Sequence, residues 1–214
     1  MKASAGKAGE NQKVLELTTL YEISKVVSST LDLDVVAAST LKLLSDFLGL
    51  NRGALTLMDE ATGHLTIRAA YGMTREEIRK GKYRVGEGVT GQVVQTGLPM
   101  IVPKIGSEPL FLDRTGSRKR LNKADISFIS VPIRLSGRVV GALSVDRVFA
   151  GHVSSDEEIR FLSIVAGIFA QAVHIQMLVE AEKKALTQEN ESLRSQLKGK
   201  YKFDNIIGES DRMQ

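Results

Sequence analysis

Few residues of this chain are of a type and spacing that could carry out covalent or proton-transfer chemistry. The 214 residues include no cysteine, which excludes disulfides, thiolate metal sites, cysteine nucleophiles and thioether-linked bilins. The three histidines, His64, His152 and His174, have no second metal ligand at helical or hairpin spacing. A nucleophile with an adjacent base cannot be assembled from the remaining residues. The sequence therefore predicts neither a catalytic site nor a metal site.

The motif with the clearest chemical interpretation is glycine-rich. Residues 86–91 read Gly-Glu-Gly-Val-Thr-Gly and fit the G-x-G-x-x-G fingerprint of dinucleotide-binding folds. That fold requires a full helix and a buried parallel strand after the glycines, whereas a helix here can only reach Gly97 before Pro99. We interpret the motif as a tight turn followed by a short helix. No G-x-x-x-x-G-K-[ST] motif occurs in the sequence, so we expect no ATP hydrolysis by these residues.

A ligand pocket is easier to assemble from these residues than a catalytic site. Residues 103–125 form a long connection without periodicity, and connections of that length are usually functional or disordered. Within it, residues 109–112 (Pro-Leu-Phe-Leu) are expected to fold over the sheet as a short helix. Arginines on neighbouring elements can hold a carboxylate through their fork of donors. The candidate ligand-binding residues are Arg68, Tyr71, Phe111, Arg114, Ser130 and Arg134.

Two alternatives to this pocket stay open. The arginines can point to solvent, and the space can fill with the chain's own leucine and valine side chains. The densest basic stretch, residues 114–123, is interpreted as a solvated loop. The net charge of +4, from 29 Lys+Arg against 25 Asp+Glu, is too small to require a nucleic-acid partner. No apolar run approaches the roughly 20 residues of a membrane span, so we expect a cytoplasmic protein without a membrane partner.

The elements that would position these residues predict an α+β fold. Amphipathic helices are expected over residues 11–29 and 34–48, the second beginning at Asp34 as N-cap and ending at Gly49. Two short helices are expected over 74–80, with Thr74 and Glu77 in capping-box spacing, and over 89–96. Between them lie short strands, over residues 52–58, 65–71, 83–85, 99–102, 126–135 and 139–145. This pattern predicts a central antiparallel sheet of five or six strands with helices packed on one face.

The last predicted helix is longer than such a domain needs. It runs from about residue 155 to residue 197, and its second half narrows to one apolar seam with Val179, Leu186 and Leu193 seven residues apart. Asn190 falls four residues after Leu186, as a lone polar residue in a two-stranded coiled coil would. We therefore expect a homodimer; the alternative is a charged linker helix that never pairs. The residues expected at the dimer interface are Leu17, Leu20, Val27, Leu186, Asn190 and Leu193.

The order of several short motifs resembles a GAF domain. They are residues 86–91, residues 97–103 (Gly-Leu-Pro-Met-Ile-Val-Pro), residues 130–133 (Ser-Val-Pro-Ile) and residues 140–146 (Val-Gly-Ala-Leu-Ser-Val-Asp). The resemblance implies a GAF-like sheet followed by a long signalling helix. Cyclic nucleotides are not expected, because Asn122-Lys123 and Phe128 occur without the Asp-Glu pair that completes that family's nucleotide motif.

Other phrases resemble the regulatory region of sigma-54-dependent transcription activators, in particular the NifA family that controls nitrogen-fixation genes. They are residues 65–72, 108–115, 126–133 and 201–208, the last continuing as Phe-Asp-Asn-Ile-Ile-Gly-Glu-Ser over 203–210, like the beginning of the AAA+ ATPase domain of these activators. We therefore expect a disordered leader over 1–12, a GAF regulatory domain over 13–178, a coiled-coil-like linker helix over 179–199 and the start of a truncated ATPase domain over 200–214.

The resemblance also implies a function. In such activators the regulatory domain restrains or licenses an ATPase that remodels sigma-54 RNA polymerase, and other domains contact DNA. Some members bind 2-oxoglutarate and some have an inhibitory protein partner. We expect no permanent cofactor, and a sensory domain that acts through a small effector or a partner and through dimerisation. The alternative is a ligand-free dimerisation and docking module that receives an inhibitor protein.

Overall fold

The computed structural model describes residues 2–59, 61–118, 126–148 and 156–200 of the chain. The chain divides into two compact units, residues 1–175 and residues 176–214. The first unit contains the sheet and the helices that pack on it. In the second, the described residues, 176–200, are the helical continuation of α5 (Asp156–Lys200).

The sheet of the first unit is antiparallel throughout its described part and has the strand order β3-β2-β1-β6-β5-β4. This architecture confirms the predicted α+β class and the antiparallel sheet of five or six strands. The longest strands, β5 and β6, lie side by side near one end of the order, and they carry most of the functional residues discussed below. The strands are β1 (Arg52–Met58), β2 (His64–Tyr71), β3 (Lys82–Arg84), β4 (Met100–Val102), β5 (Ile126–Leu135) and β6 (Arg138–Val148).

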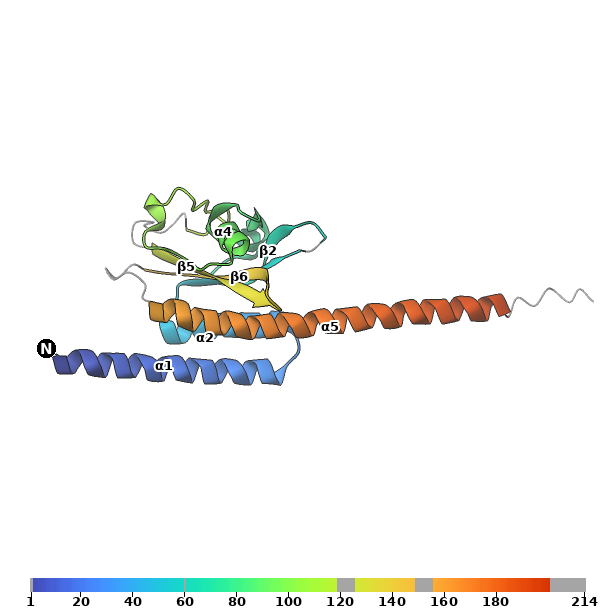
Figure 1. Ribbon diagram of the computed structural model, residues 1–214, viewed down its shortest axis with the longest axis horizontal. Coiled ribbons are helices and arrows are strands. Elements are labelled where there is room, and N and C mark those ends of the chain that lie inside the picture. Colours follow the sequence, from blue (N-terminus) through green and yellow to red (C-terminus); the bar gives the residue numbers. More distant parts are fainter. Residues whose placement is uncertain (1, 60, 119–125, 149–155, 201–214) are drawn as a thin grey trace, which may run out of the picture. The chain divides into compact units, whose positions relative to one another are not determined.

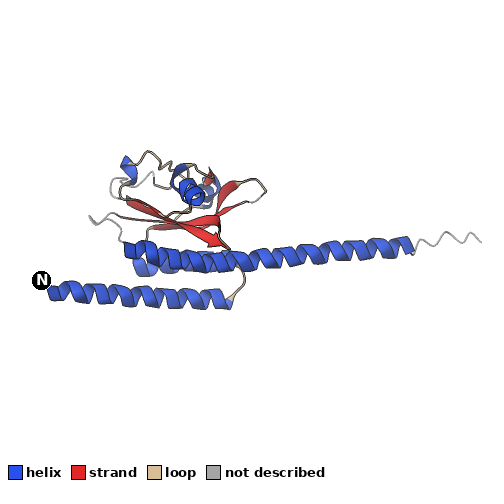
Figure 2. Ribbon diagram, viewed as in Figure 1, coloured by secondary structure: helices blue, strands red, loops and turns tan. Residues whose placement is uncertain are grey.

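Helices cover both faces of the sheet, where the sequence analysis predicts them on one. Figure 1 shows α1, α2 and the first part of α5 on one face, and α4 on the other; Figure 2 shows the same layers by secondary structure. The glycine-rich turn leads from β3 into α4, and α4 lies across the second face of the sheet. β3 and α4 are both too short to form the long crossover that joins two parallel strands. The helical elements are α1 (Lys2–Ser29), α2 (Leu33–Leu48), α3 (Arg75–Lys80), α4 (Gly88–Thr96), the 3₁₀ helix η1 (Ile105–Ser107) and α5.

The ends of the helices follow capping chemistry, with one correction. The N-cap of α2 is Asp32 rather than Asp34, because the Asp32 carboxylate accepts from the backbone N–H groups of Asp34 and Val35 at 2.8 and 3.3 Å. The predicted left-handed end at Gly49 is confirmed, with φ of 64°. The capping box between Thr74 and Glu77 is confirmed as well.

The first helix differs from the predicted disordered leader over 1–12, because α1 begins at Lys2. This segment contains no proline and is rich in Ala and Lys, which favour helix. Once the following turns are held by packing, each further residue adds a backbone hydrogen bond without a new nucleation step.

The main core lies between the sheet and α1, α2 and α5. Alternate residues of β5, Ile129, Val131 and Ile133, point into it, as the two-residue repeat of a strand requires. On the helix side, Phe169 of α5 is fully buried. By length and apolar composition α5 is the one described helix that would be able to cross a membrane, but the apolar residues of its first half are core residues of this kind.

Candidate functional site

A small pocket lies on the face of the sheet covered by α4 and by the connection after β4. Its volume is about 40 Å³, well below the roughly 300–1,000 Å³ typical of small-molecule sites. The chain's own side chains therefore fill most of the space. The pocket is lined by Ala54, Thr56, Ile67, Met73, Tyr83, Gly88, Val89, Thr90, Phe111, Leu112, Asp113, Thr115, Arg118, Phe128 and Ser144.

Phe111 covers this pocket from the long connection. The predicted helix over 109–112 is absent, and the described helical turn of the connection is η1 instead. The backbone N–H of Phe111 donates to the carbonyl of Glu108 at 3.0 Å, and this turn directs the ring onto the sheet. There Phe111 meets Phe128 of β5 edge to face, with ring centroids 5.1 Å apart. The prediction that this apolar segment covers the sheet holds, with a turn in place of the helix.

The polar centre of the pocket is an ion pair between Arg118 and Asp146. Nε of Arg118 donates to Oδ2 of Asp146 at 2.8 Å, and the two residues are 4% and 2% exposed. Asp113 lies on the other side of the guanidinium, 3.6 Å from Nη1. The guanidinium also lies over the rings of Phe111 and Phe128, 4.9 and 5.6 Å from their centroids. One arginine thus holds together the connection, β5 and β6.

This finding corrects the interpretation of residues 114–123 as a solvated loop. Arg118 belongs to that stretch and is buried, whereas Arg114 is exposed and pairs with Glu87 at the start of α4. Residues 119–125 lie outside the described residues. A guanidinium can be buried here because a carboxylate and two aromatic faces replace its water.

Two arginines, Arg118 and Arg52, lie beside the buried carboxylate of Asp146. Burial raises the pKa of the Asp146 carboxyl, and the charges of Arg118 and Arg52 oppose that shift. Nη1 of Arg52 lies 3.7 Å from Asp146, while its Nη2 donates to the carbonyl of Ser117 at 2.7 Å. Tyr83 borders the same pocket, and burial raises the pKa of its phenol. The connection is therefore held to the sheet by the ion pair of Arg118 with Asp146 and by the hydrogen bond from Arg52 to Ser117.

The glycine-rich motif forms the rim of the pocket. Gly86 and Gly88 have φ of 83° and 64°, and α4 ends at Gly97 with φ of 68°. At Gly91 a Cβ would lie 2.4 Å from the carbonyl oxygen of Arg84, so the close approach of two backbone segments requires glycine there. The structure shows the turn and short helix that the sequence predicts for this motif.

Residues 32–173 match the GAF domain family. The chain belongs to this family. Over 201 residues it is 43% identical to the Nif-specific regulatory protein of Herbaspirillum seropedicae, an alignment that covers 94% of this chain and 37% of that protein. Over 198 residues it is 39% identical to the nitrogen fixation protein VnfA of Azotobacter vinelandii, covering 92% and 38%. The chain thus spans a little over a third of the length of these relatives.

Solved structures show the same fold at low sequence identity. The A. aeolicus nlh2 GAF domain, crystallised in an inactive state, superposes with a TM-score of 0.67 at 22% identity, over 77% of this chain and 99% of that one. A GAF domain from a phosphoenolpyruvate-protein phosphotransferase of Coxiella burnetii gives 0.68 at 21% identity, over 78% and 98%. These likenesses support the fold and say nothing of the ligand.

The GAF pocket gathers only part of the predicted ligand-binding set. Phe111 lines it, and Ser130 is buried beside it with its hydroxyl 2.9 Å from that of Ser144. Arg114 lies at the rim through its pair with Glu87.

The other three predicted residues lie elsewhere. Arg68 pairs with Asp34 of α2 at 2.7 Å, and Tyr71 packs against the main core on the opposite face. Arg134 donates to the carbonyl of Gly97 at 2.7 Å and so fixes the end of α4. Arg118 is not among the pocket residues predicted from the sequence. Asp146 follows the apolar strand predicted over 139–145, and a carboxylate buried at the end of such a strand requires a cationic partner, so this aspartate was the available signal.

The predicted dimerisation residues differ in exposure. Leu17 of α1 is 67% exposed, whereas Leu20 and Val27 pack partly against the core of their own unit. In the second unit Leu186 and Leu193 are more than half exposed, and Asn190 is exposed as well. Dimerisation through these residues stays a prediction. Within the described ranges, no group of three His, Asp or Glu residues is arranged to hold a metal ion.

Proposed function

We propose that this chain is the regulatory GAF domain of a sigma-54-dependent activator of nitrogen-fixation genes. The observation that carries the proposal is the similarity to a Nif-specific regulatory protein over 94% of the chain, combined with the Phe-Asp-Asn-Ile-Ile-Gly-Glu-Ser phrase over residues 203–210. The ATPase domain, sigma-54 RNA polymerase and DNA are then the partners of the full-length protein, in the cytoplasm.

Helix α5 supports a route for the signal. Its first turns are part of the GAF core, where Phe161, Val165 and Phe169 are buried, and the helix continues without interruption to Lys200. Its 45 residues correspond to roughly 70 Å of helix. We propose that a change in the packing of the core is passed to the later residues of this helix, where a coupling of about 1–3 kcal/mol is enough to bias an equilibrium between two states.

The effector we propose is a small dicarboxylate of the 2-oxoglutarate type, bound in the GAF pocket. Support comes from Arg118, the arginine that lines this pocket. Its Nε is held by Asp146 and its Nη1 lies 3.6 Å from Asp113, so an incoming carboxylate would take the place of Asp113 when the connection moves and leave the bond to Asp146 intact. Phe111 and the connection would have to move outward, because about 40 Å³ does not admit such a ligand.

A second candidate function is favoured by the same small volume. A pocket filled by its own side chains is what a ligand-free docking module would have, and such a module would receive an inhibitor protein. The exposed apolar residues Val14, Leu17 and Tyr21 on α1 would suit either this partner or a second copy of the chain.

Thermal unfolding with and without 2-oxoglutarate tests the choice. An effector present at about 100 times its dissociation constant adds about 2.7 kcal/mol of stability, which raises Tm by several degrees. The shift should disappear in Arg118→Met and persist in Arg114→Met, the exposed neighbour. No shift with millimolar 2-oxoglutarate, glutamine or nucleotides would reject the sensor in favour of the docking module.

A further inference from the structure

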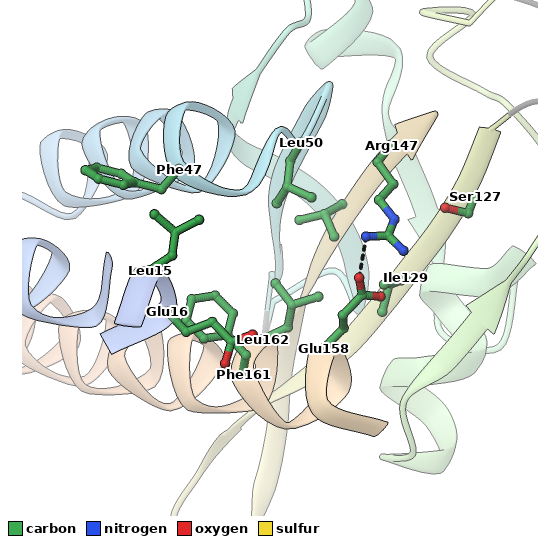
Figure 3. Close-up of a pocket in the computed structure, with 11 residues that line it drawn as sticks. Leu15, Glu16, Phe47, Leu50, Ser127, Ile129, Arg147, Glu158, Phe161 and Leu162 are labelled. Atoms are coloured by element: carbon green, nitrogen blue, oxygen red, sulfur yellow. Dashed lines mark ion pairs between the residues drawn. The ribbon is translucent and has the colours of Figure 1, made fainter. Parts of the chain in front are cut away.

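A second and larger cavity lies on the opposite face of the sheet from the GAF pocket. Its volume is about 400 Å³, within the range typical of small-molecule sites. The walls come from α1, the end of α2, β5, β6 and the first turns of α5 (Figure 3). Apolar residues form most of this wall: Leu15, Phe47, Leu50, Ile129, Val145, Phe161 and Leu162.

One end of the cavity is polar and contains unpaired atoms. Arg147 of β6 forms an ion pair with Glu158 of α5 through Nη1 and Oε1 (Figure 3). Three neighbouring polar atoms are buried without a hydrogen-bond partner among the described residues: Oγ of Ser127, Nε of Arg147 and Oε2 of Glu158. Ser127 is only 4% exposed. Leaving such groups unpaired is unfavourable, so a polar group placed here would be stabilised.

The electrostatics of this end centre on the carboxyl of Glu158. Burial raises the pKa of the Glu158 carboxyl, Arg147 lowers it, and the negative charge of Glu16 on α1 raises it. Glu16 also lines the cavity, so its polar end contains both acidic and basic side chains. A ligand that satisfies this end needs a donor, best a cation, for Oε2 of Glu158 and an acceptor, best an anion, for Nε of Arg147 and the hydroxyl of Ser127.

We propose that this cavity binds a free amino acid with a large apolar side chain, as its zwitterion. The α-ammonium group donates to Oε2 of Glu158 beside Glu16. The α-carboxylate accepts from Nε of Arg147 and from Oγ of Ser127. The side chain packs in the apolar part of the cavity, between Phe47 and Phe161. The site is separate from the GAF pocket, and binding there does not depend on the function proposed above.

The charge pattern selects against related ligands. A fatty acid has no donor for Oε2 of Glu158 and places its own carboxylate near that oxygen. An amino-acid amide has no anion for Arg147, and an N-acetylated amino acid has no cation. The fatty acid would leave Oε2 of Glu158 unpaired, and the amide and the N-acetyl derivative would each replace a charge-assisted hydrogen bond by a weaker neutral one, so each should bind on the order of tenfold or more less tightly.

Isothermal titration calorimetry on the 214-residue chain tests the proposal with L-leucine and L-phenylalanine as ligands. Octanoate, L-leucinamide and N-acetyl-L-leucine serve as matched comparisons. We expect the two amino acids to bind roughly tenfold or more tightly than all three comparisons. Equal binding of octanoate or of the amide would overturn the zwitterion assignment. No heat from either amino acid at millimolar concentration would overturn the site, and the cavity would then hold water only.

Two variants place the ligand in this cavity. Glu158→Gln removes the proposed partner of the ammonium group and should weaken binding roughly tenfold or more, while Glu157→Gln, on the exposed side of the same turn, should leave it unchanged. Ser127→Val removes an unpaired hydroxyl, so it should leave Tm unchanged or higher and yet weaken binding severalfold. Equal effects of the two glutamate variants, or unaltered binding by Ser127→Val, would show that the amino acid binds elsewhere.

Discussion

Replacing Arg118 by methionine should destabilise the GAF domain by far more than replacing an exposed arginine. The substitution leaves the carboxylate of Asp146, only 2% exposed, without the donor that now lies 2.8 Å away. Removing one member of a buried ion pair typically costs about 3–5 kcal/mol. Arg52 remains 3.7 Å from Asp146 and compensates in part, so we expect the lower end, about 3 kcal/mol. For a unit of this size that corresponds to a fall in Tm of roughly 6–12 °C.

The loss of stability in Arg118→Met should also depend on pH, and it should increase as the pH rises. Burial already raises the pKa of Asp146, and losing Arg118 removes the main charge that opposes this shift. A carboxyl whose pKa is higher in the folded than in the unfolded state favours folding at low pH, and that contribution is lost as the pH rises through the folded pKa. The stability gap between wild type and Arg118→Met should therefore be small below about pH 4, the ordinary pKa of an aspartic acid, and should widen as the pH rises above it until Asp146 is ionised in the folded variant.

Chemical denaturation at a series of pH values measures both effects. The matched control is Arg114→Met, which breaks an exposed pair with Glu87 and should cost at most about 1 kcal/mol. Adding Asp146→Asn to Arg118→Met removes the orphaned charge and should restore most of the stability. If Arg118→Met lowers the free energy of unfolding no more than Arg114→Met does, or if its effect does not change with pH, the ion pair between Arg118 and Asp146 does not hold the connection to the sheet.

Three further changes test the core, a helix cap and the dimer. Phe169→Ala, at a fully buried position of α5, should lower the free energy of unfolding by about 3–5 kcal/mol in urea denaturation, and a loss under about 1 kcal/mol would contradict its place in the core. Asp32→Ala removes the cap of α2 and should cost about 1 kcal/mol in the same assay, and a larger loss in Asp34→Ala than in Asp32→Ala would reject this cap. Leu193→Lys places a charge in the predicted coiled-coil seam and should convert a dimer to a monomer by light scattering; an unchanged mass rejects the coil.

Much of the fold could be predicted because local signals and tertiary packing agree. The alternation in β5, the glycine that ends α2 at Gly49 and the capping box at Thr74 each specify an element without reference to the rest of the chain. Asp32 and Asp34 show the limit of such signals, since either residue type can cap and only the position of the first helical turn decides between them.

The site was less predictable, because it depends on which side chains a long connection brings to the sheet. Arg114 and Arg118 are the same residue type, four positions apart in one charged stretch, and one is exposed while the other is buried. No periodicity distinguishes them. The difference arises from Asp146, which follows 28 residues after Arg118 and becomes its neighbour only when β6 is placed in the sheet. Pairings of that kind need the tertiary structure.

Two consecutive residues of β6, Asp146 and Arg147, belong to the surroundings of the two cavities. Asp146 pairs with Arg118 of the GAF pocket on one face, and Arg147 lines the cavity on the other face, because successive side chains of a strand alternate. Arg147 in turn holds Glu158 in the first turns of α5. Arg118 is therefore connected to α5 through two ion pairs and one peptide bond. Such proximity becomes evidence of coupling only when both sites respond to each other.

The corresponding prediction concerns the affinity of the apolar amino acid. In Arg118→Met the end of β6 loses its tie to the connection, so Arg147 is held less firmly against Glu158 and binding should weaken by about fivefold or more, the lower end of usual coupling. Arg114→Met should leave this affinity unchanged. By reciprocity, whatever factor an effector of the GAF pocket applies to the affinity for the amino acid, the amino acid applies to the affinity for that effector. Equal dissociation constants in wild type and Arg118→Met would mean that the sheet insulates the two cavities, and the signal would then have to enter α5 through the main core around Phe161 and Phe169 alone.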